Sequence, residues 1–173
     1  ATGLAEILAA SGAPKGSLYH YFPHGKVQIG AEVVEYAAAR VTATLTALTG
    51  TEPTPGAVLR RYARMVVGWL EESDFRDGSP ITTTLLELSP QQPEVTAAGR
   101  AAFADWSGVL EQGLTAAGVP AADATRLATL ALAALDGALV QARVRRDGTP
   151  VTDVLDQVAD LFDAAVATAG TGG

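Results

Sequence analysis

Apolar residues recur at helical spacing along almost the whole chain, and this periodicity limits the fold more than any other feature of the sequence. No segment sustains the alternation of apolar and polar residues that a half-buried strand requires. Short clusters of Gly, Pro, Ser and Thr separate the apolar segments, and such clusters end one helix and cap the next. The pattern predicts an all-α fold of about eight helices, the first two very short.

The breaks between apolar segments also predict a domain organisation. A helix-turn-helix head is expected within residues 1–48, including a long connecting helix from about Lys26 to Leu48. A helical body is expected over residues 49–169, and a disordered Gly/Thr tail over 170–173. Within the body, the apolar spacing and the Pro-containing loops predict five helices, over about 58–69, 80–88, 93–118, 121–146 and 150–169.

Composition limits the cell compartment and the chemistry. The 173 residues include no cysteine, which excludes disulfides and thiolate metal sites. The most apolar run, residues 127–140, is interrupted by Asp136 and falls short of the ~18–20 residues that a membrane span needs. Nothing at the start of the sequence resembles a signal peptide. We therefore expect a soluble cytoplasmic protein with no membrane partner.

The net charge of −7 at first argues against a nucleic-acid partner. Its distribution weakens that argument, because residues 1–40 carry three basic and three acidic side chains and are neutral overall. The remaining nine basic and sixteen acidic residues all lie in residues 41–173. A neutral head on an acidic body permits local DNA binding, although composition alone does not require it.

The segment from Leu4 to Lys26, LAEILAASGAPKGSLYHYFPHGK, carries the most functional information. Two short helical patterns are joined by a tight Ser-Gly turn, which is the layout of a helix-turn-helix. The second helix has small residues where its first turn would approach the bases, and basic and aromatic residues beyond them. The amides at the start of the following helix, together with Lys26, form a second place for a phosphate.

The string PKGSLYHYF followed by a Lys-initiated long helix resembles the helix-turn-helix of the TetR family of transcriptional regulators. The FPHGK form and the DGSPI string at residues 77–81 resemble the YxaF/LmrA-like subgroup of that family. The resemblance implies a repressor that small, lipophilic ligands release from palindromic operator DNA, with no catalytic residues, no cofactor and no metal. It implies operator contacts for Lys15, Gly16, Ser17, Tyr19 and His20, and phosphate contacts for Tyr21 and Lys26.

Two features depart from the family pattern. Pro14 stands where the family usually has a capping Ser or Thr, so a hydroxyl that could touch phosphate is absent. The family also has a helix before the position of residue 1, which packs the DNA-binding head. The strong resemblance covers about 25 residues, and the rest of the chain agrees only in the number and length of its helices.

The helix expected over residues 121–146 is apolar nearly all round, so we expect both of its sides to be covered. The resemblance implies a four-helix dimer interface built from this helix and the last one. The alternative is the central helix of a monomeric bundle. The residues expected at the interface are Ala131, Ala134, Gly137, Ala138, Leu155, Val158 and Phe162.

A ligand cavity in the body is also implied by the resemblance. Its expected lining is aromatic and aliphatic, although such residues at helical spacing also suit a plain core. Asp136, within the apolar helix, is expected to be paired or at an interface. The residues expected to line the cavity are Met65, Trp69, Phe75, Leu85, Phe103 and Trp106.

Two other classes of function remain open from the residues alone. Both histidines, His20 and His24, fall in the helix-turn-helix region, so an enzyme would need a carboxylate-only site such as Glu87, Asp105 and Asp136. The other class is an all-α ligand-binding or interaction protein without DNA binding. A gel shift with the DNA upstream of the protein's own gene separates these functions from a repressor.

The motif generates a first prediction. Replacing Lys15 by Ala in the full-length protein should weaken operator binding and lower the slope of log affinity against log salt by about one unit, because one phosphate contact is lost. Titrations of operator DNA at several salt concentrations measure both quantities. An unchanged affinity and slope would show that the residues around Lys15 are not the recognition helix.

Overall fold

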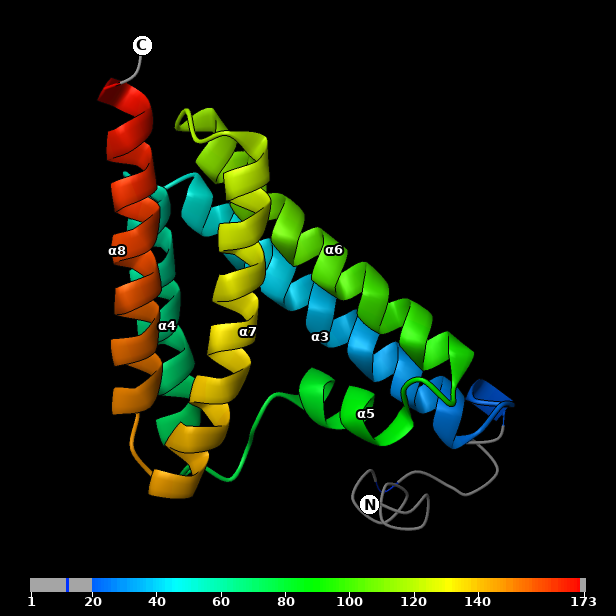
Figure 1. Cartoon of the computed structure of the whole chain (residues 1–173). Coiled ribbons are helices and arrows are strands. Elements are labelled where there is room, and N and C mark those ends of the chain that lie inside the picture. Colours follow the sequence, from blue (N-terminus) through cyan, green and yellow to red (C-terminus); the bar gives the residue numbers. More distant parts are fainter. Residues whose placement is uncertain (1–11, 13–19, 172–173) are drawn as a thin grey trace. The chain divides into compact units, whose positions relative to one another are not determined.

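The computed structural model describes residue 12 and residues 20–171, and the described residues form six helices and no strand (Figure 1). This confirms the predicted all-α class. The helix labels begin at α3, and the bounds are α3 Lys26–Thr49, α4 Pro55–Glu72, α5 Pro80–Leu88, α6 Pro93–Ala116, α7 Ala121–Arg145 and α8 Thr149–Thr171.

Proline and the residue before it set several of these starts. Pro55 is the first residue of α4, and the Thr54 side chain accepts a hydrogen bond from the Ala57 backbone N–H at 3.1 Å. Pro80 and Pro93 open α5 and α6 in the same way, because proline has no N–H and its fixed φ suits the first turn. Gly25, with a φ of +65°, forms the turn that precedes α3.

The C-terminal helix runs further than the sequence pattern predicted. Residues 170 and 171 were expected in a disordered tail, but α8 continues to Thr171. The Thr168 and Thr171 hydroxyls donate hydrogen bonds to the carbonyls of Ala164 and Thr168, which are their neighbours one turn back. These hydrogen bonds from side chains to the backbone lie within the last turns of α8.

The chain folds into two compact units that are not continuous in sequence. The smaller unit is formed by residues 1–38 and 80–102, and the larger unit by 39–79 and 103–173. Both α3 and α6 contribute residues to each unit. The long helix that starts at Lys26 is therefore one of two helices that are shared by both units.

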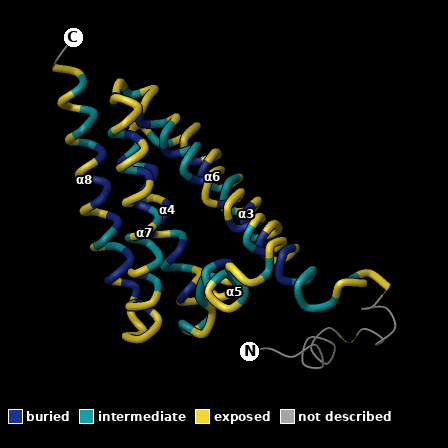
Figure 2. Tube along the Cα trace, turned by 45° about the vertical axis from the view of Figure 1, so that its right-hand side comes forward, coloured by how far each residue is buried: buried dark blue, intermediate teal, exposed yellow. Residues whose placement is uncertain are grey.

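In the larger unit, α8 lies beside both α4 and α7 (Figure 1). Buried and exposed residues alternate along these helices in stripes (Figure 2). The side chain of Phe162 on α8 is fully buried, as are Leu114 of α6 and Leu155 of α8. Leu127 and Leu132 of α7 pack partly buried against this core. The fully buried residues of α7 are all alanines, which lets α8 approach closely: Ala124, Ala128, Ala131, Ala138 and Ala142.

Charge pairs reinforce the contact between α4 and α8. The Arg60 guanidinium on α4 donates to the Asp163 carboxylate at 2.8 Å and also pairs with Asp156 and Asp160, all on one side of α8. The hydrogen bond to Asp163 is the largest of the effects that raise the pKa of Arg60. A Cβ added to Gly56 would lie 2.3 Å from the Asp163 carboxylate, so a glycine there leaves room for this arrangement.

By length and composition alone, α7 is long and apolar enough to cross a membrane, which corrects the expectation drawn from uninterrupted apolar runs. The same test is passed by core helices of proteins that never enter a bilayer. Within this chain, α7 packs against α8 through its alanine stripe. The apolar character of α7 is therefore used, at least on one side, for packing inside the protein.

The buried Phe162 gives a second prediction. Phe162→Ala should lower the free energy of unfolding by about 3–5 kcal/mol, because a large side chain leaves a cavity that its neighbours fill only in part. Urea denaturation measures the change. Thr168→Ala on the exposed side of the same helix is the control and should stay within about 0.5 kcal/mol of the wild type. Equal losses in the two variants would contradict this description of the core.

Candidate functional site

The described part of the predicted DNA-binding head begins at His20. Four predicted contacts, Lys15, Gly16, Ser17 and Tyr19, lie outside the described residues. His20 and Tyr21 form the end of a helix. Both side chains are exposed, Tyr21 to 70%, and their rings meet edge to face at 5.2 Å. Their hydroxyl and imidazole groups are accessible to an anionic partner.

Gln28 fixes the turn between this helix and α3. Its side-chain oxygen accepts a hydrogen bond from the His24 backbone N–H at 3.2 Å, and its amide nitrogen donates to the Tyr21 carbonyl at 3.3 Å. The nitrogen also donates to the Glu32 carboxylate at 2.9 Å. Gln28 is the third residue of α3, where Gln often reaches back over the helix start. We did not single it out from the sequence, although its position was a usable signal.

Lys26 is the first residue of α3, and its ammonium pairs with the Glu87 carboxylate of α5 at 2.8 Å. Its hydrogen bond lowers the pKa of Glu87 below its ordinary value. The two side chains are 38% and 40% exposed, so solvent and ions reach both of them. The resemblance implied a phosphate contact for Lys26. Nothing in the sequence indicated that Lys26 would pair with Glu87, which is 61 residues away.

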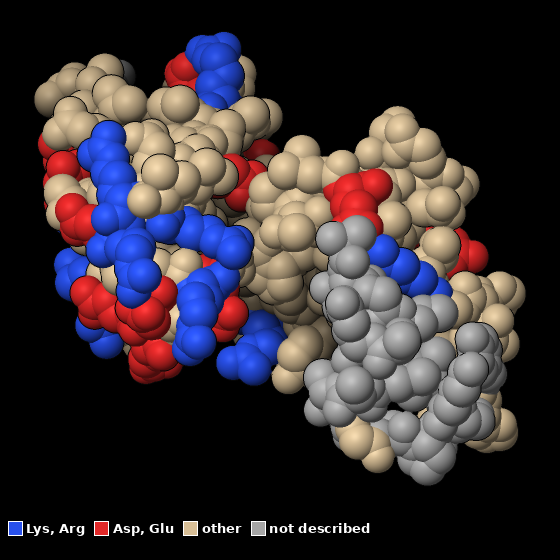
Figure 3. Space-filling view, turned by 90° about the horizontal axis from the view of Figure 1, so that it is seen from below, with Lys and Arg blue, Asp and Glu red and all other residues tan. Residues whose placement is uncertain are grey.

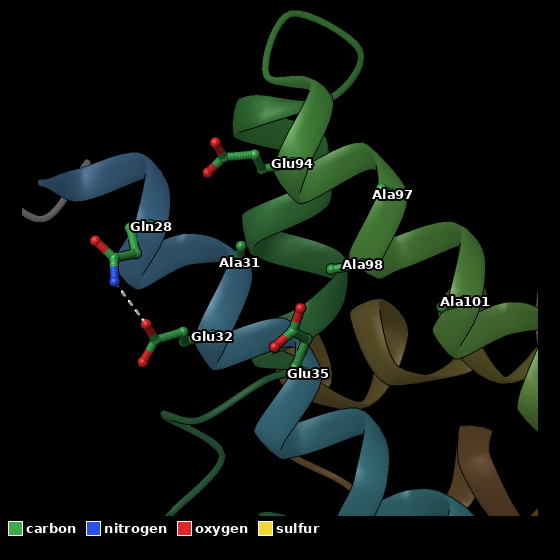
Figure 4. Close-up of a pocket in the computed structure, with 8 residues that line it drawn as sticks. All are labelled: Gln28, Ala31, Glu32, Glu35, Glu94, Ala97, Ala98 and Ala101. Atoms are coloured by element: carbon green, nitrogen blue, oxygen red, sulfur yellow. Dashed lines mark hydrogen bonds between the residues drawn. The ribbon is translucent and has the colours of Figure 1, made fainter. Parts of the chain in front are cut away.

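A groove in the smaller unit runs between the first half of α3 and the start of α6 (Figure 4). Its volume is about 570 Å³, and alanine side chains and carboxylates line it. None of the six residues predicted to line a ligand cavity takes part in it. The lining residues are Gln28, Ala31, Glu32, Glu35, Glu94, Ala97, Ala98 and Ala101.

The residues predicted to bind a ligand fall in both units. Leu85 belongs to the smaller unit, and the other five belong to the larger one. Trp69 packs edge to face against Tyr62, and Phe103 packs in the same way against Trp106. Trp69 and Phe103 remain 45% and 36% exposed. Burial raises the pKa of the neighbouring Tyr62 to about 12.

The residues predicted at a dimer interface divide into two groups. Gly137 is exposed and Ala134 is half-buried. The other five are at most 4% exposed within a single chain, so their side chains belong to its own core: Ala131, Ala138, Leu155, Val158 and Phe162. A partner chain would meet the other side of these helices. That side of α7 carries larger aliphatic residues, since Leu130, Val140 and Val144 are 43%, 60% and 80% exposed.

The carboxylates considered for an enzyme do not form one cluster in either unit. Glu87 lies in the smaller unit, whereas Asp105 and Asp136 lie in the larger one. Asp136 is half-buried and has an interaction partner, in agreement with the expectation of a paired acid. Across residues 20–171 and Gly12, no group of three or more His, Asp or Glu side chains is arranged to hold a metal ion.

The charged surface matches the composition of the chain. On the face shown in Figure 3, several Lys and Arg side chains of the described residues gather next to one another, with Asp and Glu side chains among and below them. Ion pairs such as Arg146 with Asp74, at 2.6 Å, are part of this pattern in the larger unit.

Comparison with known proteins places residues 55–157 within a family of domains described as the transcriptional regulator LmrA/YxaF-like, C-terminal domain. The chain is 37% identical over 167 residues to a protein of Mycobacterium tuberculosis named as an HTH-type transcriptional regulator, covering 94% of this chain and 84% of that protein. It is 27% identical to the HTH-type transcriptional regulator LmrA of Bacillus subtilis, covering 93% and 86% of the two chains.

The fold is likewise similar to a solved regulator. The crystal structure of a regulatory protein TetR from Rhodobacter sphaeroides superposes with a TM-score of 0.79 and 25% identity, covering 92% of this chain and 87% of that chain. This likeness and the two sequence relatives all extend over more than nine-tenths of this chain.

Proposed function

This chain belongs to the TetR family of helix-turn-helix transcriptional regulators, in its LmrA/YxaF-like branch, and from that premise we propose that it is a homodimeric repressor that a small molecule releases from operator DNA. It acts by binding, without chemistry, in the cytoplasm. One observation carries the proposal: the chain joins a helix-turn-helix string to a helix, α7, on which Leu130, Val140 and Val144 are exposed. Two heads held in one assembly are what a palindromic operator requires.

The proposed interface is the outward face of α7, with Leu161 of α8 beside it. Leu130, Gly137 and Val144 are spaced seven residues apart, which is about two helical turns. They therefore lie one after another along this face. Leu161 is 49% exposed. An apolar helix face of this length is unusual on a monomer and suits burial against a second copy. Gly137 lies in its middle, where its missing side chain lets another helix approach.

Gly137→Arg should convert the dimer to a monomer without unfolding the subunit. No atom lies within 4 Å of a Cβ built on Gly137, so the new side chain has space within its own chain. In the dimer its charge would be buried without a partner, at a cost on the order of 3 kcal/mol, or roughly a hundredfold in the dimer dissociation constant. Sedimentation velocity measures the assembly, and circular dichroism monitors the helices.

The matched control is Gly113→Arg on α6, where an added Cβ also meets no atom within 4 Å. This variant should remain dimeric. Ala138→Glu is a poorer test, because Ala138 is buried within its own subunit and the substitution would disturb folding first. A Gly137→Arg protein that stays dimeric, or a wild type that is monomeric, rules out this face as the interface.

The proposed inducer is a lipophilic compound that binds among the predicted aromatic and aliphatic residues of the larger unit. The exposed portions of Trp69 and Phe103 support this choice, because they supply aromatic surface that a ligand would remove from water. The alanine and carboxylate groove of the smaller unit has a different chemistry and is not assigned to the inducer.

Release requires that inducer binding change the spacing of the two heads. Both recognition helices enter successive major grooves only when they are about 34–36 Å apart. A ligand alters this spacing only if it binds one arrangement of the dimer more tightly than the other. We propose that α3 transmits the change, because it starts next to the helix-turn-helix and continues into the larger unit.

This mechanism predicts reciprocal coupling. A compound that weakens operator binding by a given factor should itself bind more weakly, by the same factor, to the operator-bound protein. Calorimetric titration of a lipophilic compound into the dimer, with and without operator DNA, measures both sides. A typical coupling of about 5–150-fold is expected. Identical compound affinities in the two titrations would reduce the body to a dimerisation scaffold with no sensor role.

A further inference from the structure

Lys26 and Glu87 each stand at the end of a helix where their charge is unfavourable. Lys26 is the first residue of α3, and α3 has no acidic residue in its first turn. Glu87 is the residue before last in α5, and α5 has no basic residue in its last turn. The N-terminal end of a helix carries partial positive charge and the C-terminal end partial negative charge. The partial charge of each helix end has the same sign as the side chain that stands there. A nearby group of opposite charge therefore stabilises each side chain.

The two side chains supply that charge to each other. The Glu87 carboxylate accepts a hydrogen bond from the Lys26 ammonium at 2.8 Å, next to the start of α3. An ammonium beside a helix N-terminus is a combination that binds phosphate in many proteins. The anion that pairs with Lys26 in this structure is thus a carboxylate of the protein itself.

Two glycines allow α5 to bring Glu87 to this position. A Cβ added to Gly30 of α3 would lie 2.9 Å from the Leu88 side chain, and one added to Gly99 of α6 would lie 2.4 Å from the Leu85 side chain. Real Cβ atoms do not approach so closely, so the missing side chains of Gly30 and Gly99 leave room for these leucines where α5 packs on α3 and α6. Leu88 follows Glu87 in sequence and Leu85 stands two residues before it. The packing of these two leucines holds the Glu87 carboxylate within reach of Lys26.

We propose that Glu87 occupies the place that an operator phosphate takes at Lys26, so that DNA must displace this carboxylate to bind. The inference rests on the proposed function and adds to it a residue that sets operator affinity. Carboxylate and phosphate oxygens are both acceptors for the same ammonium protons. Because the pair is more than one-third exposed, a phosphate reaches Lys26 without unfolding the unit. The position of α5 then determines how available Lys26 is to DNA.

Glu87→Gln tests the competition, because it keeps the size of the side chain and removes its charge. Fluorescence anisotropy of labelled DNA from upstream of the protein's own gene gives the affinity of the full chain at several salt concentrations. We expect about two- to fivefold tighter binding, in keeping with the strength of exposed ion pairs. We also expect a steeper salt dependence, by up to about one unit, because Lys26 no longer exchanges one anion for another.

Two further proteins separate competition from a general loss of negative charge. In a Lys26→Ala background, Glu87→Gln should bring no gain, since the shared partner is gone. Glu94→Gln, which neutralises a carboxylate at the start of α6 in the same unit, should leave the affinity near that of the wild type. Thermal unfolding of each variant confirms that the fold is retained.

Each alternative outcome has one interpretation. An equal gain in DNA affinity from Glu87→Gln in both backgrounds, or the same gain from Glu94→Gln, would overturn the proposed competition at Lys26. Such a gain would come from weaker long-range repulsion between the protein's carboxylates and DNA. No gain from Glu87→Gln would overturn it as well, while operator binding by the wild type would keep the proposed function intact. A wild-type chain that binds none of this DNA would remove the proposed function, and the inference that rests on it.

Discussion

The packing of α8 against both α4 and α7 is the contact on which the larger unit depends. Five alanines of α7 are buried in its core, together with large side chains such as Phe162 of α8 and Leu114 of α6. Leu127 of α7 packs partly buried against the same core, whereas Val140 and Val144 are exposed. The same helix therefore contributes to the core and carries exposed aliphatic residues of the proposed dimer interface.

This arrangement also shows where sequence reasoning succeeds and where it stops. The helix starts at Pro80 and Pro93 were predictable, because the missing N–H and fixed φ of proline act locally. The inward face of α7 was not, because a helix that is apolar all round gives no periodic contrast between its sides. Ala131 and Ala138 were assigned to a partner, whereas they face the subunit's own core.

The smaller unit shows the same division between local and distant information. Lys26 was predicted as a phosphate contact from its place at the start of a helix after the helix-turn-helix string, and Gln28 carries a local signal of the same kind. Glu87 carries none, because its meaning depends on α5 returning to the unit that contains the start of α3. A contact across 61 residues is a property of the fold, and a single sequence does not reveal it.

The Arg60 cluster has a consequence for how the chain tolerates substitution. Three aspartates on successive turns of α8 share one guanidinium, so each of them has a substitute if it is lost. Arg60 has none. Without it, Asp156, Asp160 and Asp163 would stand three and four residues apart as like charges, a spacing that destabilises a helix. Mutational robustness is therefore unequal across this contact: α8 can drift in sequence at its acidic positions, whereas α4 is held to a single arginine.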